Sequence, residues 1–242
     1  LIDRVATRLG RRLVEVPLSF FPQPVARLQQ AWRLREADWN AALRAEALGQ
    51  TVQADVFHLY ALKEGVVTSS VLLNYFVVGA PASEWRIEVP ATVGNLDVTG
   101  QNVRRDWRRE GDQVIVSLHQ PVLGAATLLL TFEEPMSARG GTITPGVVRP
   151  LGVAAERGFL QVVSPRQVKH EIRRAEGALL KMEPAELPAE FRTFTSAPSL
   201  AAYHYTARPF AFEMAIEWYA PGETVDQVVD FAKLTSQVAR DG

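Results

Sequence analysis

Cysteine is absent from this chain of 242 residues, and its absence removes several classes of chemistry. Without cysteine the protein has no disulfide framework, no thiolate metal ligand and no thiol nucleophile. A surplus of one charge is missing too, because 26 lysines and arginines are matched by 27 acidic residues and the formal net charge is −1. A chain so close to neutral has no overall basic field to attract nucleic acid or an anionic membrane. We therefore expect no nucleic-acid partner.

Long hydrophobic runs are also lacking. The longest apolar-rich stretch, residues 66–82, is interrupted by polar residues such as Ser69 and Asn74. It falls short of the roughly 18 consecutive apolar residues that a membrane-spanning helix requires. The opening residues are too polar to form the apolar region of a signal peptide. We therefore expect any membrane attachment to come from segments outside this sequence.

Clusters of chemically active side chains are missing as well. The histidines are scattered without metal-ligand spacing, at His58, His119, His170 and His204. A zinc site or a catalytic triad requires such groups to converge, and the sequence gives no sign that they do. We interpret these histidines as ordinary surface or half-buried residues. No carboxylate pair is singled out among Asp97, Asp106, Glu133 and Glu134. The sequence predicts no catalytic residue, no metal and no cofactor.

Alternation of apolar and polar residues is the dominant pattern in the chain. Residues 67–77, 85–89, 114–118 and 126–132 alternate with a period of two and are rich in β-branched residues. This period places every second side chain on one face, as expected for strands with one buried face. Turn residues containing glycine and proline separate these runs, which is typical of a β-sandwich. We predict an all-β fold with β-sandwich architecture.

Two distant segments share the same order of residues. Residues 15–17 (Glu-Val-Pro) correspond to residues 186–188 (Glu-Leu-Pro), and residues 49–53 correspond to residues 222–226. A shared order at a nearly constant offset indicates a repeated structural unit. The aromatic, alternating second copy favours a strand, so the ambiguous residues 39–48 are also predicted to form a strand.

The repeat divides the predicted fold into four segments. These are a first copy of the repeated strand segment (1–51), a β-sandwich (52–137), a connector with strands (138–184), and a second copy with the start of a truncated next module (185–242). We expect residues 31–48 and 202–219 to adopt the same strand-turn-strand conformation. Residues 225–242 carry several apolar side chains, which favours docking on the preceding strands or self-association.

Most of the chain resembles large uncharacterised bacterial proteins. The similarity is carried by residues 54–65, 74–76, 97–100 and 149–153. The proteins it resembles are extracytoplasmic, membrane-tethered chains of tandem β-sandwich modules. The resemblance implies an envelope location, in the periplasm or at the cell surface, and supplies no catalytic residue.

The arginine-rich segment, residues 104–109, is the sharpest local signal. Arg104, Arg105 and Arg108 surround Trp107, and an arginine cluster around an aromatic ring can hold a polyanion. The alternative, which we favour, is a solvated hairpin with Trp107 packed inward. Trp32, Trp39 and Trp85 follow the apolar parity and are interpreted as core.

Trp218 and Tyr219 are the remaining candidates for ligand contact. Together with Trp107 and its arginines they complete the set of residues that could touch a ligand. The sequence favours a non-enzymatic structural or protein-interaction module of a large bacterial envelope protein, with a carbohydrate-binding or carbohydrate-processing accessory domain as the alternative. The expected partners are neighbouring modules of the same chain, a protein or a glycan.

Overall fold

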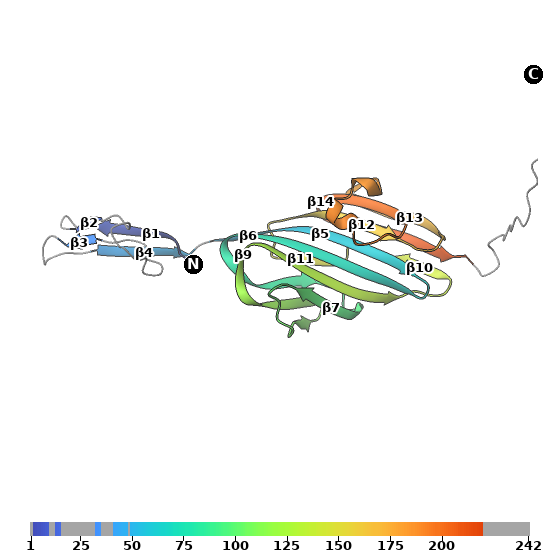
Figure 1. Cartoon of the computed structure of the whole chain (residues 1–242), viewed down its shortest axis with the longest axis horizontal. Helices are drawn as coiled ribbons and strands as arrows, with labels where there is room; N and C mark the ends of the chain where they lie inside the picture. The colour runs from blue at the N-terminus through green and yellow to red at the C-terminus, as the bar shows by residue number, and fades with distance from the viewer. Residues whose placement is uncertain (1, 10–12, 16–31, 35–40, 48, 220–242) are drawn as a thin grey trace, which may run out of the picture.

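The computed structural model describes residues 2–9, 13–15, 32–34, 41–47 and 49–219 (Figure 1). Almost all of its elements are strands, which confirms the predicted all-β class. They are β1 (Ile2–Leu9), β2 (Leu13–Glu15), β3 (Trp32–Leu34), β4 (Ala41–Ala47), β5 (Gln50–Lys63), β6 (Val66–Glu88), β7 (Gly94–Gly100), β8 (Arg108–Glu110), β9 (Gln113–Pro135), β10 (Gly140–Ile143), β11 (Arg149–Leu151), β12 (Ala155–Val163), β13 (Val168–Lys181) and β14 (Ser199–Trp218). A 3-10 turn, η2 (Pro184–Glu186), and one helical turn, α1 (Ala189–Arg192), precede β14.

Strands β5 to β14 form one mixed sheet. Its main order is β10-β14-β12-β5-β6-β9-β7, with β11 on β6, β13 on β14 and β8 on β9. The pairing of β12 with β5 is parallel, and the other pairings in this sheet are antiparallel. The pairs β1-β4 and β2-β3 form two small separate sheets. The predicted strand at residues 39–48 is confirmed for the span of β4.

The longest strands fold back on themselves. Tyr75 and Trp85 both belong to β6, and a straight strand would separate them by roughly 33 Å at its usual rise per residue. Their rings instead stack in parallel with centroids 4.1 Å apart. The strand register shifts between Val77 and Ala82, so β6 turns a corner there. Trp85 is buried, as the sequence predicted.

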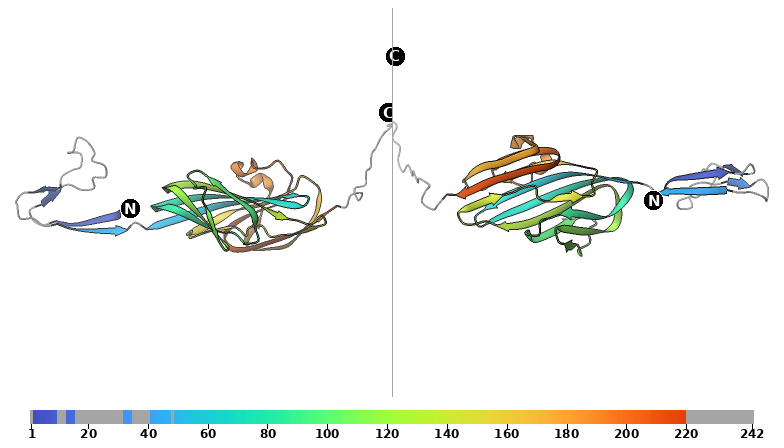
Figure 2. Two further views of the ribbon diagram at one scale, coloured as in Figure 1. Left: turned by 90° about the horizontal axis from the view of Figure 1, so that it is seen from below. Right: turned by 180° about the vertical axis from the view of Figure 1, so that it is seen from behind.

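Strand β14 turns a second corner. Tyr205 and Phe210 have ring centroids 4.5 Å apart, and Tyr203 and Phe212 have centroids 5.1 Å apart. The neighbouring strand β13 follows this corner, because its register jumps between Gly177 and Leu179. Corners of this kind let one set of strands supply both layers of a sandwich. Figure 2 shows the resulting elongated body from two further sides.

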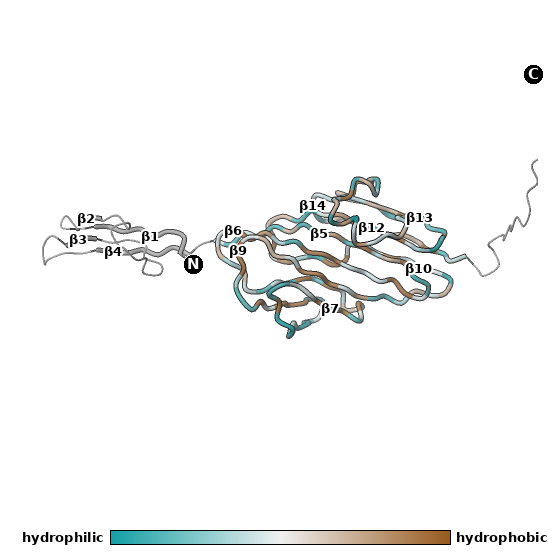
Figure 3. The backbone as a smooth tube through the Cα atoms, in the orientation of Figure 1, coloured by the Kyte–Doolittle hydropathy of each residue, from teal (hydrophilic) through white to brown (hydrophobic). Residues whose placement is uncertain are grey.

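One hydrophobic core fills the space between the layers. Val71, Leu130, Leu160 and Met214 come from four different strands and are completely buried. Hydrophobic stretches lie along the central strands and hydrophilic ones at many of the connecting loops (Figure 3). Alternating burial along β6 and β14 is the direct result of the period-two pattern in the sequence.

A smaller apolar cluster covers the outer face of β5 and β12. Phe57 stacks on Phe191 of α1 with ring centroids 4.5 Å apart, and Leu187 is buried beside them. The segment with η2 and α1 therefore acts as a cover for this face. Because β5 is covered on both faces here, it has a nearly continuous buried stretch in place of strict alternation.

The single sheet runs through the segment boundaries predicted from the sequence. β10 to β13 come from the predicted connector and β14 from the predicted second copy, yet β12 and β14 pair in the same sheet as β5. Residues 202–219 lie in β14 and the residue after it, and β14 is one bent strand. Residues 31, 35–40 and 48 of the predicted first copy, and the predicted tail, residues 225–242, lie outside the described residues.

Candidate functional site

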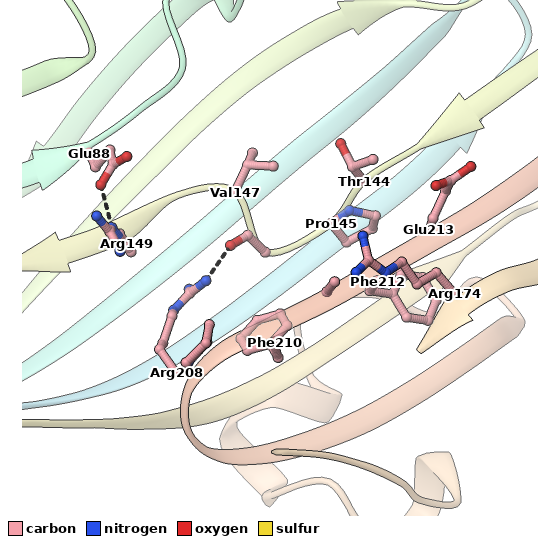
Figure 4. A pocket seen from close by; sticks show the side chains of 13 residues that line it. Glu88, Thr144, Pro145, Val147, Arg149, Arg174, Arg208, Phe210, Phe212 and Glu213 are labelled. Carbon is pink, nitrogen blue, oxygen red and sulfur yellow. Dashed lines mark hydrogen bonds and ion pairs between the residues drawn. The ribbon is translucent and has the colours of Figure 1, made fainter. Parts of the chain in front are cut away.

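On one side of the sheet the pairing between neighbouring strands is interrupted, and we call this gap the seam. Strand β11 pairs with β6, whereas β10 pairs with β14, and the chain crosses from one to the other through residues 144–148. Within the described strands, residues 210–213 of β14 pair only with β13. A pocket of about 400 Å³, the seam pocket, opens at this place (Figure 4).

Arg208 lines the seam pocket and forms a largely buried ion pair with Glu156. The guanidinium Nε of Arg208 donates to Oε1 of Glu156 at 2.9 Å, and the two side chains are only 18% and 8% exposed. The other two nitrogens of Arg208 donate to the carbonyl oxygens of Gly146 at 2.7 Å and Val148 at 3.1 Å. Arg208 therefore ties β14, β12 and the residue 144–148 segment together, because its planar guanidinium offers several donors in fixed directions.

Tyr205 and His58 extend this buried group. The Tyr205 hydroxyl donates to Oε1 of Glu156 at 2.8 Å, and Nε2 of His58 lies 3.3 Å from the same hydroxyl. Since that hydroxyl gives its only proton to Glu156, we infer that His58 carries its proton on Nε2 and donates it to Tyr205. Burial and the nearby Arg208 lower the pKa of His58 to about 3. Burial and the Glu156 charge raise the pKa of Tyr205.

Two glycines permit the close packing around this group. A Cβ on Gly146 would lie 2.5 Å from the Phe210 ring, so only glycine lets the residue 144–148 segment rest on that ring. Gly177 has φ +82°, and a Cβ there would lie 2.6 Å from the carbonyl oxygen of Pro209. Both glycines occupy backbone conformations that disfavour other residues.

The rim of the seam pocket carries exposed charges on two sides. Figure 4 shows Arg149 and Glu88 on one side of Phe210, and Arg174 and Glu213 on the other. Arg149 pairs with Glu88, and their side chains are 48% and 36% exposed. Arg174 pairs at 2.7 Å with Glu176, which is also exposed. Exposed ion pairs contribute little to stability, so a ligand could exchange with them at small cost.

The arginine-rich segment lies elsewhere, in the loop before β8 and in the first two residues of β8. Arg104 and Arg105 are exposed, Arg108 pairs with Glu110 at 2.8 Å, and Trp107 is partly buried against the main core. Arg109 of the same segment donates to the carbonyl oxygens of Val89, Pro90 and Val93. This geometry matches the solvated hairpin with an inward tryptophan.

Trp218 and Tyr219 are also separate from the arginine-rich segment. Trp218 packs against the main core at the end of β14, and Tyr219 is 39% exposed with the Lys169 ammonium 5.3 Å from its ring centre. No aromatic contact between Trp107 and either residue occurs in the described part of the chain. The candidate contacts therefore do not form one site with each other.

Sequence reasoning missed the residues that meet in the seam. His58 was interpreted as a surface or half-buried residue, but it is completely buried. Its only signal was its position within the apolar run of β5, where a lone polar residue needs a buried partner. Arg208 had a weaker signal, as an isolated arginine before Pro209 and an aromatic strand. No feature of the sequence singled out Glu156 or Tyr205.

Within the residues that the structure describes, no three histidine, aspartate or glutamate side chains come together in a group suited to a metal ion. No helix in the same residues is long and apolar enough to cross a membrane.

Comparison with known proteins gives only distant structural likenesses. No protein-family model matches the chain, and no curated protein matches it. An M1 zinc metallopeptidase from Deinococcus radiodurans is 15% identical with a TM-score of 0.40, over 69% of this chain and 42% of that one. Its E323A mutant bound to a Tyr-Ser-Ala substrate gives a TM-score of 0.42 at the same identity and coverage.

A hydrolase gives a similar result. Leukotriene A4 hydrolase from Saccharomyces cerevisiae is 9% identical with a TM-score of 0.37, over 69% of this chain and 28% of that one. The chain thus spans less than half the length of these proteins. Likenesses at these TM-scores are too slight for any residue of those enzymes to be transferred to this chain.

The function expected from the sequence is corrected by this comparison. The chain is similar to portions of peptidases and of a hydrolase. We had expected a non-enzymatic module of an envelope protein or a carbohydrate-binding or carbohydrate-processing accessory domain. Strand periodicity could not distinguish a module of an envelope protein from a part of an enzyme, because it indicates the presence of a sheet and not the kind of protein that contains the sheet. The resemblance to tandem-module proteins, the envelope location and the expected partners stay predictions.

Proposed function

We propose that residues 49–219 form a peptide-binding domain whose seam pocket holds the C-terminal end of a short peptide. The observation that carries this proposal is the arrangement in the seam pocket of an exposed guanidinium, Arg149, together with the partly exposed apolar side chains of Phe210 and Val147. The volume, about 400 Å³, lies within the range of small-ligand sites.

Arg149 is the residue that would hold the peptide carboxylate. A guanidinium binds a carboxylate through two parallel hydrogen bonds, which makes this pairing stronger and more directional than a lysine contact. Glu88, the present partner of Arg149, is partly exposed and can return to water when the ligand arrives. The last side chain of the peptide then packs on Phe210, and the rest of the ligand passes Glu213 and Arg174.

The buried ion pair supports this role by fixing the shape of the pocket. Arg208 holds the carbonyl oxygens of Gly146 and Val148, so the wall from Thr144 to Val147 is set before a ligand binds. A binding site that is already formed loses less conformational entropy when it binds. Peptide binding is compatible with the structural likeness to parts of peptidases. The proposal nevertheless rests on the seam pocket alone.

Calorimetric titration of the full 242-residue chain tests this function. The ligands are acetyl-Gly-Gly-Phe with a free carboxylate and the same peptide with a C-terminal amide. We expect the free acid to bind at least tenfold more tightly, since a charge-assisted hydrogen bond contributes about 1.5–3 kcal/mol. Arg149→Gln should remove this difference between the two peptides.

Arg157→Gln is the matched control. Arg157 also forms an exposed ion pair, with Asp55 at 2.7 Å, but it does not line the seam pocket. This variant should bind both peptides as the original chain does. Equal binding of acid and amide, no binding of either, or equal losses in the two variants would each contradict the proposal.

A further inference from the structure

A second pocket adjoins the seam pocket, and we call it the outer pocket. It measures about 470 Å³ and lies over β14, between β10 and β13. Neighbouring positions line the two pockets: Arg174 lines the seam pocket and Arg173 the outer pocket, while Glu213 lines the first and Ala215 the second. The two pockets are therefore consecutive parts of one trough along β14.

Small residues make this trough. Phe212, Met214 and Ile216 of β14 are buried, so Ala211 and Ala215 point to the opposite, outer face. Gly140 and Gly141 of β10 border the outer pocket without adding side chains. Longer charged side chains stand along β13 on the other border, so an extended chain would be guided along β14.

The outer pocket has a surplus of positive charge. Arg139, Lys169 and Arg173 line it together with His170, against two carboxylates, Glu171 and Glu217. Lys169 lies 3.7 Å from Glu217. Within the described residues, Arg139 and Arg173 form no ion pair. Two exposed guanidinium groups are thus available there for an acidic ligand.

We propose that the outer pocket is a subsite for an acidic side chain, so that the preferred ligand is an acidic peptide. This inference rests on the proposed function, because it places the peptide's C-terminal carboxylate on Arg149. Ala211 lines the seam pocket beside Phe210, and Ala215 lines the outer pocket four positions further along β14, about 13 Å away at the usual rise per residue. An extended ligand needs the same number of residues to pass from the seam pocket to the outer pocket. The acidic side chain therefore belongs four positions before the C-terminal residue.

Two peptides of equal length test the subsite. They are acetyl-Glu-Gly-Gly-Gly-Phe and acetyl-Gln-Gly-Gly-Gly-Phe, each as free acid and as C-terminal amide, titrated into the full 242-residue chain. We expect the glutamate peptide to bind five- to tenfold more tightly than the glutamine peptide. The preference should weaken as salt is raised, because both guanidinium groups are exposed to solvent.

Variants assign the preference to the two arginines. The double variant Arg139→Gln/Arg173→Gln should bind the glutamine peptide unchanged and lose its preference for glutamate, while Arg157→Gln keeps that preference. Both replaced side chains are exposed, so thermal unfolding should coincide with that of the original chain. A preference that survives in the double variant would overturn the inference.

The four peptides separate this inference from the proposed function. Equal affinity of glutamate and glutamine peptides, with the acid still stronger than the amide, would overturn the acidic subsite and leave the proposed function standing. A glutamate preference without an acid-over-amide difference would overturn both the placement of the C-terminus on Arg149 and the spacing derived from it. Equal binding of all four peptides would overturn both proposals.

Discussion

Two arginine-containing regions of this protein differ in a way that the sequence conceals. The arginine-rich segment packs four arginines into residues 104–109, and three of these side chains extend into solvent. In the seam, Arg208 is a single arginine in the sequence but is bonded to Glu156, Gly146 and Val148. The number of arginines in a short stretch of sequence therefore did not indicate where arginine contributes most to the structure.

The contrast follows from where each region lies. Residues 104–109 lead into a short edge hairpin, where charges can remain hydrated and opposing charges such as Glu110 are weak partners. The seam is a place where the sheet lacks strand pairing and the backbone carbonyls of residues 144–148 need other donors. The buried guanidinium of Arg208 supplies these donors. Because a buried charge needs an opposite charge nearby, Glu156 lies beside it.

Breaking the buried pair should have the largest effect. Arg208→Met leaves the Glu156 carboxylate buried without its cation, with only the Tyr205 hydroxyl still donating to it, and removes the donors to Gly146 and Val148. We expect the free energy of unfolding to fall by about 3–5 kcal/mol, measured by urea denaturation. Arg104→Met, in the arginine-rich segment, should stay within about 0.5 kcal/mol of the original chain. Similar losses in both variants would erase the contrast between the two regions.

The corner beside Arg208 gives the next largest effect. Gly177→Ala forces a side chain into a left-handed conformation and against the Pro209 carbonyl, which should cost about 2–4 kcal/mol. Gly124→Ala has a similar φ, +85°, but no atom within 4 Å of the new Cβ, so it should cost only about 1–2 kcal/mol. Equal losses in urea denaturation would show that backbone strain alone, without the contact, sets the cost.

His58 should make stability depend on pH. Its pKa is about 3 when folded and 6.5 ordinarily, so below pH 6.5 the unfolded chain binds a proton that the folded chain does not. Stability from this group is therefore complete above pH 6.5 and declines by about 1.4 kcal/mol per pH unit below it, until the pH approaches 3. In His58→Phe this contribution should vanish. Parallel pH profiles for the two proteins would contradict the buried, neutral histidine.

The smallest effects distinguish residues within the arginine-rich segment. Arg109→Gln removes hydrogen bonds to the carbonyl oxygens of Val89, Pro90 and Val93, so we expect a loss of about 1–2 kcal/mol. Arg105→Gln should change stability by less than about 0.5 kcal/mol, because its side chain is exposed. Thermal unfolding of both variants measures this difference. A larger loss for Arg105 would mean that the exposed arginines are structural.

Local patterns predicted the strands but not how they meet. The alternation around Tyr75 and Trp85 identified two parts of β6, and the glycine at position 79 marked the turn between them. The stacking of those two rings was not predictable, because alternation gives the face of a residue and not the path of the strand. The parallel pairing of β12 with β5 was missed for the same reason, and together with the pairing of β11 with β6 it joins the predicted connector to the sandwich.

The candidate site was less predictable than the fold. Arg149, Glu156 and Arg208 are separated in the sequence and occupy three strands, so no spacing pattern connects them. Their convergence depends on the corner of β14 and on the crossing of residues 144–148, which are tertiary features. Sequence reasoning instead selected neighbouring residues such as Arg104, Arg105 and Arg108, whose side chains the structure leaves on the surface.

Side-chain NMR of the arginines tests the central claim most directly, because it observes both regions in one titration. The Nε–H signals of the chain labelled with ¹⁵N-arginine would be followed as acetyl-Gly-Gly-Phe is added. We predict saturating shifts of the Arg149 signal, with Arg104, Arg105 and Arg108 unmoved. Shifts of Arg104, Arg105 or Arg108 with Arg149 unmoved, or no shift in any arginine, would contradict peptide binding in the seam.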